Sequence, residues 1–448
     1  MLAPEEACAL ALEKNRVYSL DHSRAGMQQL DRAINAHFEK ALAFLEALVR
    51  VPSVAGFEQP AMEVFADEAT AIGLVVERLA FASGPLTDFR AGVPPLAEQV
   101  SDGRYQVVAK TPGDGDLLLL LNGHMDVVPA ESPHLWTNPP FEPVRRDGRM
   151  YGRGTADMKS GFAIGMLALR ALREAKPDLF AERRLGFVAV VEEECTGNGT
   201  LRSITENRVI ADEVVVLEPT NLGVMLGGIG VLWIEIEVSA SAGHAYDSDA
   251  HQSAIEIGMR IVDRLRTWSV EVAMAEPEPA LASNRTPYSL NLGKVEAGDW
   301  ISSVPARATF GVRVGFPRSW TVDKAEAGVR QVVADFALSA GLKIPPRVAS
   351  TGFRARGYLL DKNHGLARDF ATAHRQAHGS APPMYMLPST TDARTFLNDF
   401  NIPALCFGAV GHNIHGVDES VELKSIVDAA RTLARFLLIR FGGDEAST

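Results

Sequence analysis

The sequence predicts an α/β fold with a mostly parallel sheet flanked by helices, into which a smaller α+β domain is inserted. Three observations predict it. Short apolar runs bounded by turn residues recur along the chain, a helical pattern separates the first two runs, and alternating apolar and polar residues dominate a later segment. Strands buried on both faces have continuous apolar runs, whereas strands with one solvated face alternate. A chain of 448 residues exceeds one ordinary core, so two domains are expected.

Four apolar runs are predicted to be strands of the parallel sheet: residues 117–121, 185–191, 214–217 and 404–407. A helix is predicted over residues 160–175, between the first two strands. Strand, helix and strand in this order imply parallel pairing with a right-handed crossover. Another helix is predicted over residues 30–51 and ends before Pro52. Residues 1–30 form an extension of unassigned role.

The inserted domain is expected over residues 226–346, and the larger α/β domain over residues 1–225 and 347–448. Alternation over residues 231–239 and 308–314 predicts antiparallel strands, and residues 288–295 are a third candidate. Helical patterns cover residues 254–267 and 322–342. The insertion is therefore of the α+β class.

Composition excludes several classes of protein. The formal net charge of −12 argues against nucleic acid or an anionic membrane as partner. The three cysteines, Cys8, Cys195 and Cys406, are far apart, which argues against a disulfide framework and a thiolate metal site. The N-terminus lacks a secretory pattern, and no apolar run approaches the roughly 20 residues of a membrane span. We expect a cytoplasmic protein.

Each predicted parallel strand is followed by residues capable of metal chemistry. Open α/β sheets place their sites at the carboxyl ends of their strands. Zinc-type ions take histidine nitrogen and carboxylate oxygen, and a pair of ions needs a bridging carboxylate. The predicted ligands are His124, Asp157, Glu194, Glu218 and His415. Asp126 lies two residues after His124, on the same side of an extended segment, where it holds the imidazole.

The run Glu192–Glu194 follows an apolar strand, so three neighbouring acids repel one another near a buried edge. A metal ion compensates for such charge, with one acid as ligand and its neighbour as general base. The glycine-rich segment 151–161 lacks the dinucleotide fingerprint and a Walker lysine. We interpret it as a bend that brings Asp157 to a metal, with Arg153 and Lys159 supporting the loop.

Six motifs carry a family resemblance: GHMDVVP, YGRGTADMKSG, VVEEECTGNGT, VLEPT, PSTTDAR and FGAVGHNIHGVDE. In order and spacing they resemble the acetylornithine deacetylase/succinyl-diaminopimelate desuccinylase family, which includes aminoacylases and carboxypeptidase G-type enzymes. The resemblance runs from about residue 44 to the C-terminus. It implies a zinc-exopeptidase-like catalytic domain with two zinc ions, an inserted lid domain that dimerises, and hydrolysis of amides.

The resemblance also implies roles for individual residues. His124 binds one metal with Glu218, His415 binds the other with Glu194, and Asp157 bridges the two. Glu193 is the general base. His244, in SAGHAY, is the lid histidine that reaches the partner's active site and polarises the substrate carbonyl.

Substrate contacts are less well defined by the sequence. Ser303 stands where the family's lid often has asparagine, and Arg313 stands where it often has a lid-strand arginine. Thr391 and Arg394 of PSTTDAR are further candidates. Arg394 is suited to bind a carboxylate through two hydrogen bonds, or else it lies on a helix surface.

The function expected is metal-dependent hydrolysis of a linear amide in a small N-acylated amino acid. Two divalent metals per chain, zinc with cobalt or manganese able to substitute, and a homodimer through the lid are expected with it. The alternatives are a metallo-dipeptidase or carboxypeptidase on the same site, a non-catalytic homologue, and an amidohydrolase of ring ureides or carbamoyl amines. The resemblance implies histidine at the position of Glu218 in that last subgroup, so Glu218 argues against it.

Overall fold

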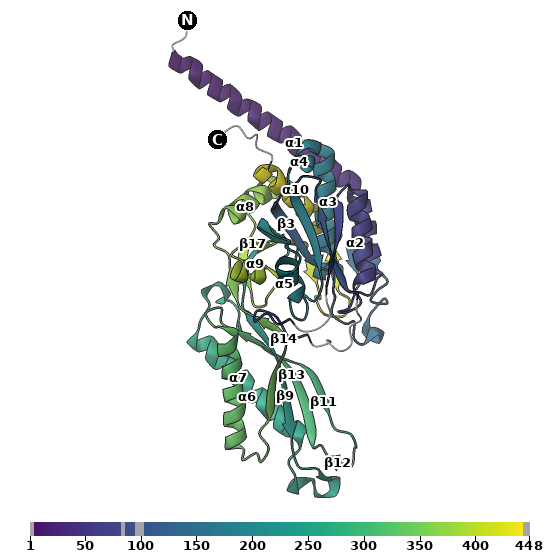
Figure 1. The fold of residues 1–448 in the computed structure, drawn as a ribbon, viewed down its shortest axis with the longest axis vertical. Helices are drawn as coiled ribbons and strands as arrows, with labels where there is room; N and C mark the ends of the chain where they lie inside the picture. The colour runs from purple at the N-terminus through teal and green to yellow at the C-terminus, as the bar shows by residue number, and fades with distance from the viewer. Residues whose placement is uncertain (1–3, 82–85, 95–102, 442–448) are drawn as a thin grey trace.

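The computed structural model describes residues 4–81, 86–94 and 103–441, and the side chains from Met27 onward within those ranges are the ones discussed below. Figure 1 shows two parts, a larger domain with a sheet between helices and a smaller domain below it. Within the described residues no helix is both long and apolar enough to cross a membrane. Cys195 and Cys406 are buried free thiols, and the Cys8 side chain lies outside the described residues.

The larger domain is built on a nine-stranded sheet in the order β1-β2-β6-β3-β7-β17-β8-β15, with β16 also paired to β8. The strand bounds are β1 (Val75–Ala80), β2 (Tyr105–Lys110), β3 (Leu117–His124), β6 (Leu185–Val190), β7 (Ala211–Val216), β8 (Val224–Gly228), β15 (Tyr358–Leu359), β16 (Met384–Leu387) and β17 (Ala404–Cys406). The four predicted strands are β3, β6, β7 and β17. Neighbouring pairs among them are parallel, which confirms the predicted core of the sheet.

Antiparallel strands extend the parallel core on both sides, so the sheet as a whole is mixed. On one side β1 and β2 pair antiparallel with each other and β2 pairs antiparallel with β6. On the other side β8 pairs antiparallel with β17 and with β15. Outer strands need not be covered on both faces, and β1 is largely exposed, so its sequence carries no continuous apolar run.

Helices cover both faces of the sheet. One face carries α1 (Pro4–Val49), α2 (Gln59–Ala71), α3 (Ser160–Ala175), α8 (Gly365–His378) and α10 (Leu423–Phe441). The other carries α5 (Asn198–Thr205) and α9 (Ala393–Asp399). The predicted helix over residues 160–175 is confirmed as α3, and the one over residues 30–51 is the C-terminal part of α1.

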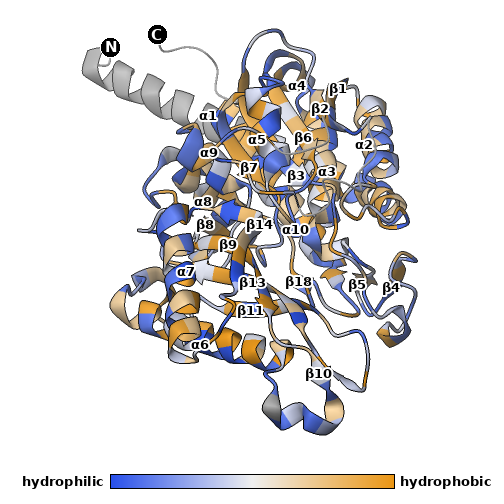
Figure 2. Ribbon diagram, turned by 60° about the horizontal axis from the view of Figure 1, so that its bottom comes forward, coloured by the Kyte–Doolittle hydropathy of each residue, from blue (hydrophilic) through white to orange (hydrophobic). Residues whose placement is uncertain are grey.

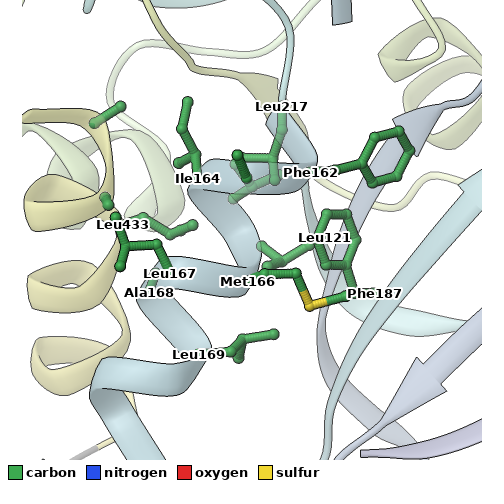
Figure 3. Packing of buried hydrophobic residues seen from close by; sticks show 14 of the residues in the cluster. Leu121, Phe162, Ile164, Met166, Leu167, Ala168, Leu169, Phe187, Leu217 and Leu433 are labelled. Atoms are coloured by element: carbon green, nitrogen blue, oxygen red, sulfur yellow. The ribbon is translucent and has the colours of Figure 1, made fainter. Parts of the chain in front are cut away.

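Helix α3 is the centre of the larger core. It is buried along almost its whole length, and Figure 3 shows its side chains between the sheet residues Leu121 and Phe187 and Leu433 of α10. Phe162 of α3 stacks on Phe187 with ring centroids 5.5 Å apart. Each such ring removes a large apolar surface from water. The start of α3 is thereby fixed, and with it the loop that carries Asp157.

The smaller domain has a four-stranded antiparallel sheet in the order β11-β13-β9-β14. Its strands are β9 (Gly230–Ser239), β11 (Leu290–Ala297), β13 (Arg307–Phe316) and β14 (Arg347–Ala355). Helices α6 (Ala254–Ala275) and α7 (Val322–Ser339) pack on one face. The three predicted strands and two predicted helices are all present.

Strand β14 lies beyond the boundary expected at residue 346. It pairs with β9 along the smaller sheet, so this sheet continues to Ala355. The correction has a physical reason: β14 is an edge strand with half-exposed residues, and its sequence RVASTGFRA does not alternate clearly.

Short elements complete the larger domain and the far end of the smaller domain. A second four-stranded sheet in the order β18-β19-β5-β4 comprises β4 (Val144–Arg146), β5 (Arg149–Tyr151), β18 (Gly411–His412) and β19 (Ser420–Glu422). At the far end of the smaller domain, β10 (Gly243–His244) pairs with β12 (Ser303–Val304) (Figure 2). Helix α4 (Pro177–Glu182) follows α3.

Candidate metal centre

The predicted ligands meet at the carboxyl end of the parallel strands. His124 is the last residue of β3, Glu194 follows β6 and Glu218 follows β7. Asp157 comes from the bend before α3, and His415 comes from the loop between β18 and β19. Hydrophobic strands thus end at one edge, where their polar neighbours converge, as expected for an open α/β sheet.

Asp157 lies between the two histidines. Its Oδ1 is 3.1 Å from Nε2 of His124, and its Oδ2 is 3.3 Å from Nε2 of His415. His415 Nε2 is also 3.1 Å from a carboxylate oxygen of Glu194, and His124 Nε2 is 3.8 Å from one of Glu218. Each histidine therefore has its own carboxylate partner, and both share Asp157. This is the arrangement that two ions with one bridging carboxylate require.

The centre gathers several buried carboxyl groups, which a nearby positive charge would stabilise in their ionised form. Burial raises the pKa of Glu218 to about 8 and that of Glu193 well above its usual range. The charge of Glu194 raises the pKa of His415 to about 11. Carboxylates packed this closely disfavour one another's ionised form, and a cation restores it. The donors, imidazole nitrogen and carboxylate oxygen, are those that zinc-type divalent ions take, so the residues fit two such ions.

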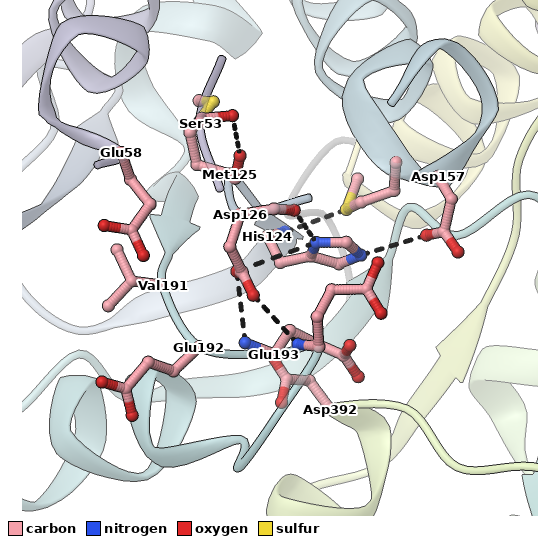
Figure 4. Close-up of polar contacts among 12 residues, drawn as sticks. Ser53, Glu58, His124, Met125, Asp126, Asp157, Val191, Glu192, Glu193 and Asp392 are labelled. Carbon is pink, nitrogen blue, oxygen red and sulfur yellow. Dashed lines mark hydrogen bonds and ion pairs between the residues drawn. The ribbon is translucent and has the colours of Figure 1, made fainter. Parts of the chain in front are cut away.

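His124 is oriented by the segment that follows it. Its Nδ1 lies 2.9 Å from the backbone oxygen of Asp126. Because a carbonyl oxygen only accepts, Nδ1 donates to it, which leaves Nε2, facing Asp157 and Glu218, as the nitrogen able to bind an ion. Figure 4 shows this geometry. The predicted role of Asp126 beside the imidazole is thus filled mainly by its backbone, since its carboxylate lies 3.8 Å from Nδ1.

The carboxylate of Asp126 instead holds the turn after β6. One oxygen accepts the backbone N–H of Glu193 at 3.2 Å and the other accepts that of Glu194 at 3.0 Å (Figure 4). Asp126 is fully buried, and burial raises its pKa to about 7. One side chain therefore positions the two successive glutamates that the sequence singled out.

The three acids of the run 192–194 have separate surroundings. Glu192 is ion-paired with the buried Arg104 at 2.7 Å, away from the histidines. The carboxylate of Glu193 lies within the influence of the charges of His124, Glu218 and Glu194, which act on its pKa. Glu194 contacts His415. Glu193 and Glu194 thus both face the centre, and their roles as base and ligand stay predictions.

Sequence reasoning missed Glu419. This buried carboxylate accepts the backbone N–H groups of Gly154, Ala156 and Asp157 at 2.9–3.0 Å and the guanidinium of Arg153 at 2.7 Å. It therefore fixes the bend that presents Asp157. The available signal was an acid four residues after His415 within NIHGVDE, a motif in which only the histidine was assigned.

The two basic residues of the bend stabilise it, as the sequence suggested. Lys159 is fully buried, and its amino group donates to the backbone oxygens of Leu48 and Val51 at 2.8 and 3.0 Å. Arg153 pairs with Glu419 and lies over the Trp136 ring. His412 pairs with Glu422 at 2.8 Å, in keeping with an ordinary loop histidine.

His244 is not brought to this centre within one chain. It is exposed on β10, at the far tip of the smaller domain, and its Nδ1 accepts the backbone N–H of Tyr246 at 3.2 Å (Figure 2). Among the described residues, none of the candidate metal ligands is in hydrogen-bond contact with His244.

The three candidate substrate residues are engaged in internal contacts. The Thr391 hydroxyl is buried and lies 2.6 Å from that of Tyr358. Arg394 is buried and donates to the backbone oxygens of Thr391 and Thr196, so it is not a helix-surface arginine. Arg313 lies between the domains, where it donates to Ser289 and Ser389. In this conformation none of the three presents a free side chain.

Comparison with known proteins assigns the chain to a family. Residues 120–439, which contain every ligand of the candidate centre, match the profile of peptidase family M20/M25/M40. The chain belongs to this family of hydrolases. Two curated M20-type relatives are named succinyl-diaminopimelate desuccinylase. The one from Methylobacterium nodulans is 30% identical over 90% of this chain and 97% of its own length, and the one from Methylobacterium radiotolerans is 28% identical over 90% and 98%.

Solved M20 structures share the fold. The dipeptidase Dug1p from Saccharomyces cerevisiae superposes with a TM-score of 0.76 at 14% identity, covering 94% of this chain and all of that one. Human carnosine dipeptidase 1 gives 0.75 at 17% identity, covering 93% and 100%. The YXEP protein of Bacillus subtilis, described as a dinuclear metal binding peptidase of the M20 family, gives 0.56 at 14% identity, covering 91% and 99%.

Proposed function

We propose that this M20 family member uses two divalent metal ions, zinc in its native form, to hydrolyse the amide bond of a small N-acylated amino acid. The observation that carries the proposal is the position of Asp157 between His124 and His415, each of which has its own carboxylate partner. His124, Glu218 and Asp157 would hold one ion, and His415, Glu194 and Asp157 the other.

Such ions, when bound, lower the pKa of a water molecule toward neutrality and polarise a carbonyl group. The chain supplies the proton transfers. Glu193 takes a proton from the attacking water and returns it to the leaving nitrogen. Burial raises the pKa of Glu193, and bound cations would favour the ionised carboxylate that accepts the proton. Asp126 keeps the backbone of Glu193 in place throughout.

The curated relatives favour a deacylase. They match nearly the whole chain at 28–30% identity and are named as desuccinylases. The second candidate is a dipeptidase or carboxypeptidase. Two of the structural neighbours are dipeptidases, but at 14–17% identity they indicate a shared fold alone. An N-acyl amino acid is therefore the substrate class we propose.

We also propose a homodimer in which His244 serves the neighbouring chain. Three large apolar side chains are exposed at the lid tip: Tyr246, two residues after His244, is 85% exposed, and Trp300 and Ile301, just before β12, are 73% and fully exposed. Strand β11 is an edge of the lid sheet with mostly exposed residues. Exposed apolar patches and open edges are features that partners cover.

Metal removal tests the proposal. We expect purified protein to contain about two metal equivalents per chain, because the donors form two sets. Dialysis against a strong chelator should abolish amide hydrolysis, and Zn²⁺ or Co²⁺ should restore it. The assay uses N-acetyl, N-succinyl and N-formyl amino acids beside dipeptides. Hydrolysis undiminished in the metal-free protein would contradict the proposal, and exclusive turnover of dipeptides would favour the second candidate.

A further inference from the structure

Glu192, the residue before the proposed base, has an unusual backbone conformation. Its φ is +61°, in the left-handed region that side-chain-bearing residues seldom adopt. This turn directs Glu193 and Glu194 into the metal centre at the end of β6. Such a conformation persists only when surrounding contacts fix it. The contacts that fix Glu192 therefore bear on the two functional glutamates.

The side chain of Glu192 is held at both oxygens. One accepts Nη1 of Arg104 at 2.7 Å, and the other accepts the Thr196 hydroxyl at 2.9 Å. Its backbone oxygen accepts the N–H groups of Thr196 and Gly197 at 3.0 and 2.7 Å. Of these partners only Arg104 comes from another part of the chain, immediately before β2.

Arg104 joins this turn to a second segment of the centre. Its Nη2 donates to Glu58 Oε1 at 2.7 Å, and all three charged side chains are at most 9% exposed. Glu58 ends the loop that begins at Ser53. The Ser53 hydroxyl donates to the backbone oxygen of Met125 at 2.6 Å, next to Asp126 (Figure 4). The bridge Glu58–Arg104–Glu192 thus links the segment carrying Asp126 to the turn carrying Glu193.

We propose that Arg104 is a positioning residue for catalysis: by bridging Glu58 and Glu192 it fixes the left-handed turn that aims Glu193 and Glu194. This inference rests on the proposed function. Asp126 holds the turn by the backbone of residues 193 and 194, and Arg104 holds it by the side chain of residue 192, so the turn is fixed from two sides. A planar guanidinium reaches two carboxylates at once, whereas an ammonium is a single point of charge.

The test compares Arg104→Gln and Arg104→Lys with the wild type. Three quantities are measured: Co²⁺ affinity of the metal-free protein, kcat and KM for an N-acyl amino acid, and melting temperature. We expect Arg104→Gln to lower kcat by about 10–100-fold and to weaken the second Co²⁺ equivalent by a similar factor, with KM changed less than about threefold. Arg104→Lys should fall between the wild type and Arg104→Gln.

The matched control is Arg435→Gln. Arg435 is a buried arginine of α10, paired with Asp31 at 2.6 Å and remote from the centre. The Arg435→Gln protein should have a lower melting temperature than the wild type, with unchanged kcat and Co²⁺ affinity. An Arg104→Gln protein that behaves in the same way would overturn the inference. If Arg104→Gln is insoluble, Glu192→Gln takes its place, and unchanged kcat and Co²⁺ affinity there would likewise overturn it.

The two proposals fail differently. A wild-type protein that binds two Co²⁺ ions but hydrolyses none of the tested amides contradicts the proposed function. In that case the Co²⁺ affinities of the Arg104 variants still decide the inference, since weaker binding in Arg104→Gln supports it and equal binding overturns it.

Discussion

At the residue scale, neighbouring acids have different roles because their surroundings differ. Glu192 is neutralised by Arg104, Glu193 is buried among like charges, and Glu194 faces a histidine. One peptide turn thus places an ion-paired acid, the proposed base and a proposed ligand in three different surroundings. The sequence showed that the run was unusual. The contacts made by Asp126 and Arg104, from distant parts of the chain, give each acid its place.

The division of roles between Glu193 and Glu194 is testable by isosteric substitution. Glu193→Gln should retain two metal equivalents while kcat falls at least about 10²-fold, because the amide cannot take a proton. Glu194→Gln should lose metal first, because its carboxylate contacts His415. Metal content by elemental analysis and steady-state kinetics measure both. The opposite pattern, metal lost from Glu193→Gln and kept in Glu194→Gln, would exchange the assignments.

At the element scale, contacts from other segments fix the backbone of the bend before α3, which carries Asp157. Residues 153–157 lead into a short helical turn, Thr155–Lys159, that is kinked at Asp157, and Glu419 accepts three of their backbone N–H groups. Lys159 ties the start of α3 to the end of α1. By accepting these backbone groups, the Glu419 carboxylate orients Asp157.

Substitution of Glu419 should therefore loosen Asp157, a proposed ligand that Glu419 holds by its backbone N–H. In Glu419→Gln an amide NH₂ replaces an oxygen that accepts backbone N–H groups, so donors face donors. We expect Co²⁺ affinity to fall by roughly 10–100-fold and the free energy of unfolding by about 2–3 kcal/mol. Calorimetry and denaturant titration measure these changes.

The neighbouring variant Asp418→Asn is the control. Asp418 contacts Thr137 at an exposed position and has no bond to the bend. Its substitution should leave Co²⁺ affinity unchanged. Equal losses of affinity in both variants would assign the effect to the loop as a whole rather than to Glu419.

At the scale of the whole molecule, the lid carries His244 away from the centre. The histidine lies on β10 at the tip of the smaller domain, beside exposed apolar side chains. If it stabilises the substrate carbonyl, a second chain must supply it, and one chain alone has an incomplete site. This is the structural argument for a dimer.

Mixing two inactive variants tests it. His244→Ala should lower kcat by roughly 10²–10³-fold, since it removes one donor to the carbonyl oxygen. When His244→Ala and Glu193→Ala subunits exchange freely, mixed dimers hold one site with both residues intact, and activity should recover to about a quarter of the wild type. Sedimentation verifies the dimer. A mixture that stays inactive despite exchange, or a fully active monomer, would contradict the idea.

Sequence alone predicted the four parallel strands, α3, the class of the inserted domain and the ligands that converge on one edge. These depend on local patterns, since buried strands are apolar and their polar ends are conspicuous. The sequence also predicted hydrolase chemistry by resemblance, which the family match bears out.

Tertiary structure decided what depends on contacts between distant residues. The outer strands are antiparallel and β14 belongs to the smaller sheet, because half-exposed edge strands have no clear pattern. Glu419, Arg104 and Glu58 act through partners more than 40 residues away in the chain. Thr391 and Arg394 are engaged in the interior, which no local pattern indicates. A sequence shows which residues can do chemistry, whereas only the packed chain shows which side chains are already occupied.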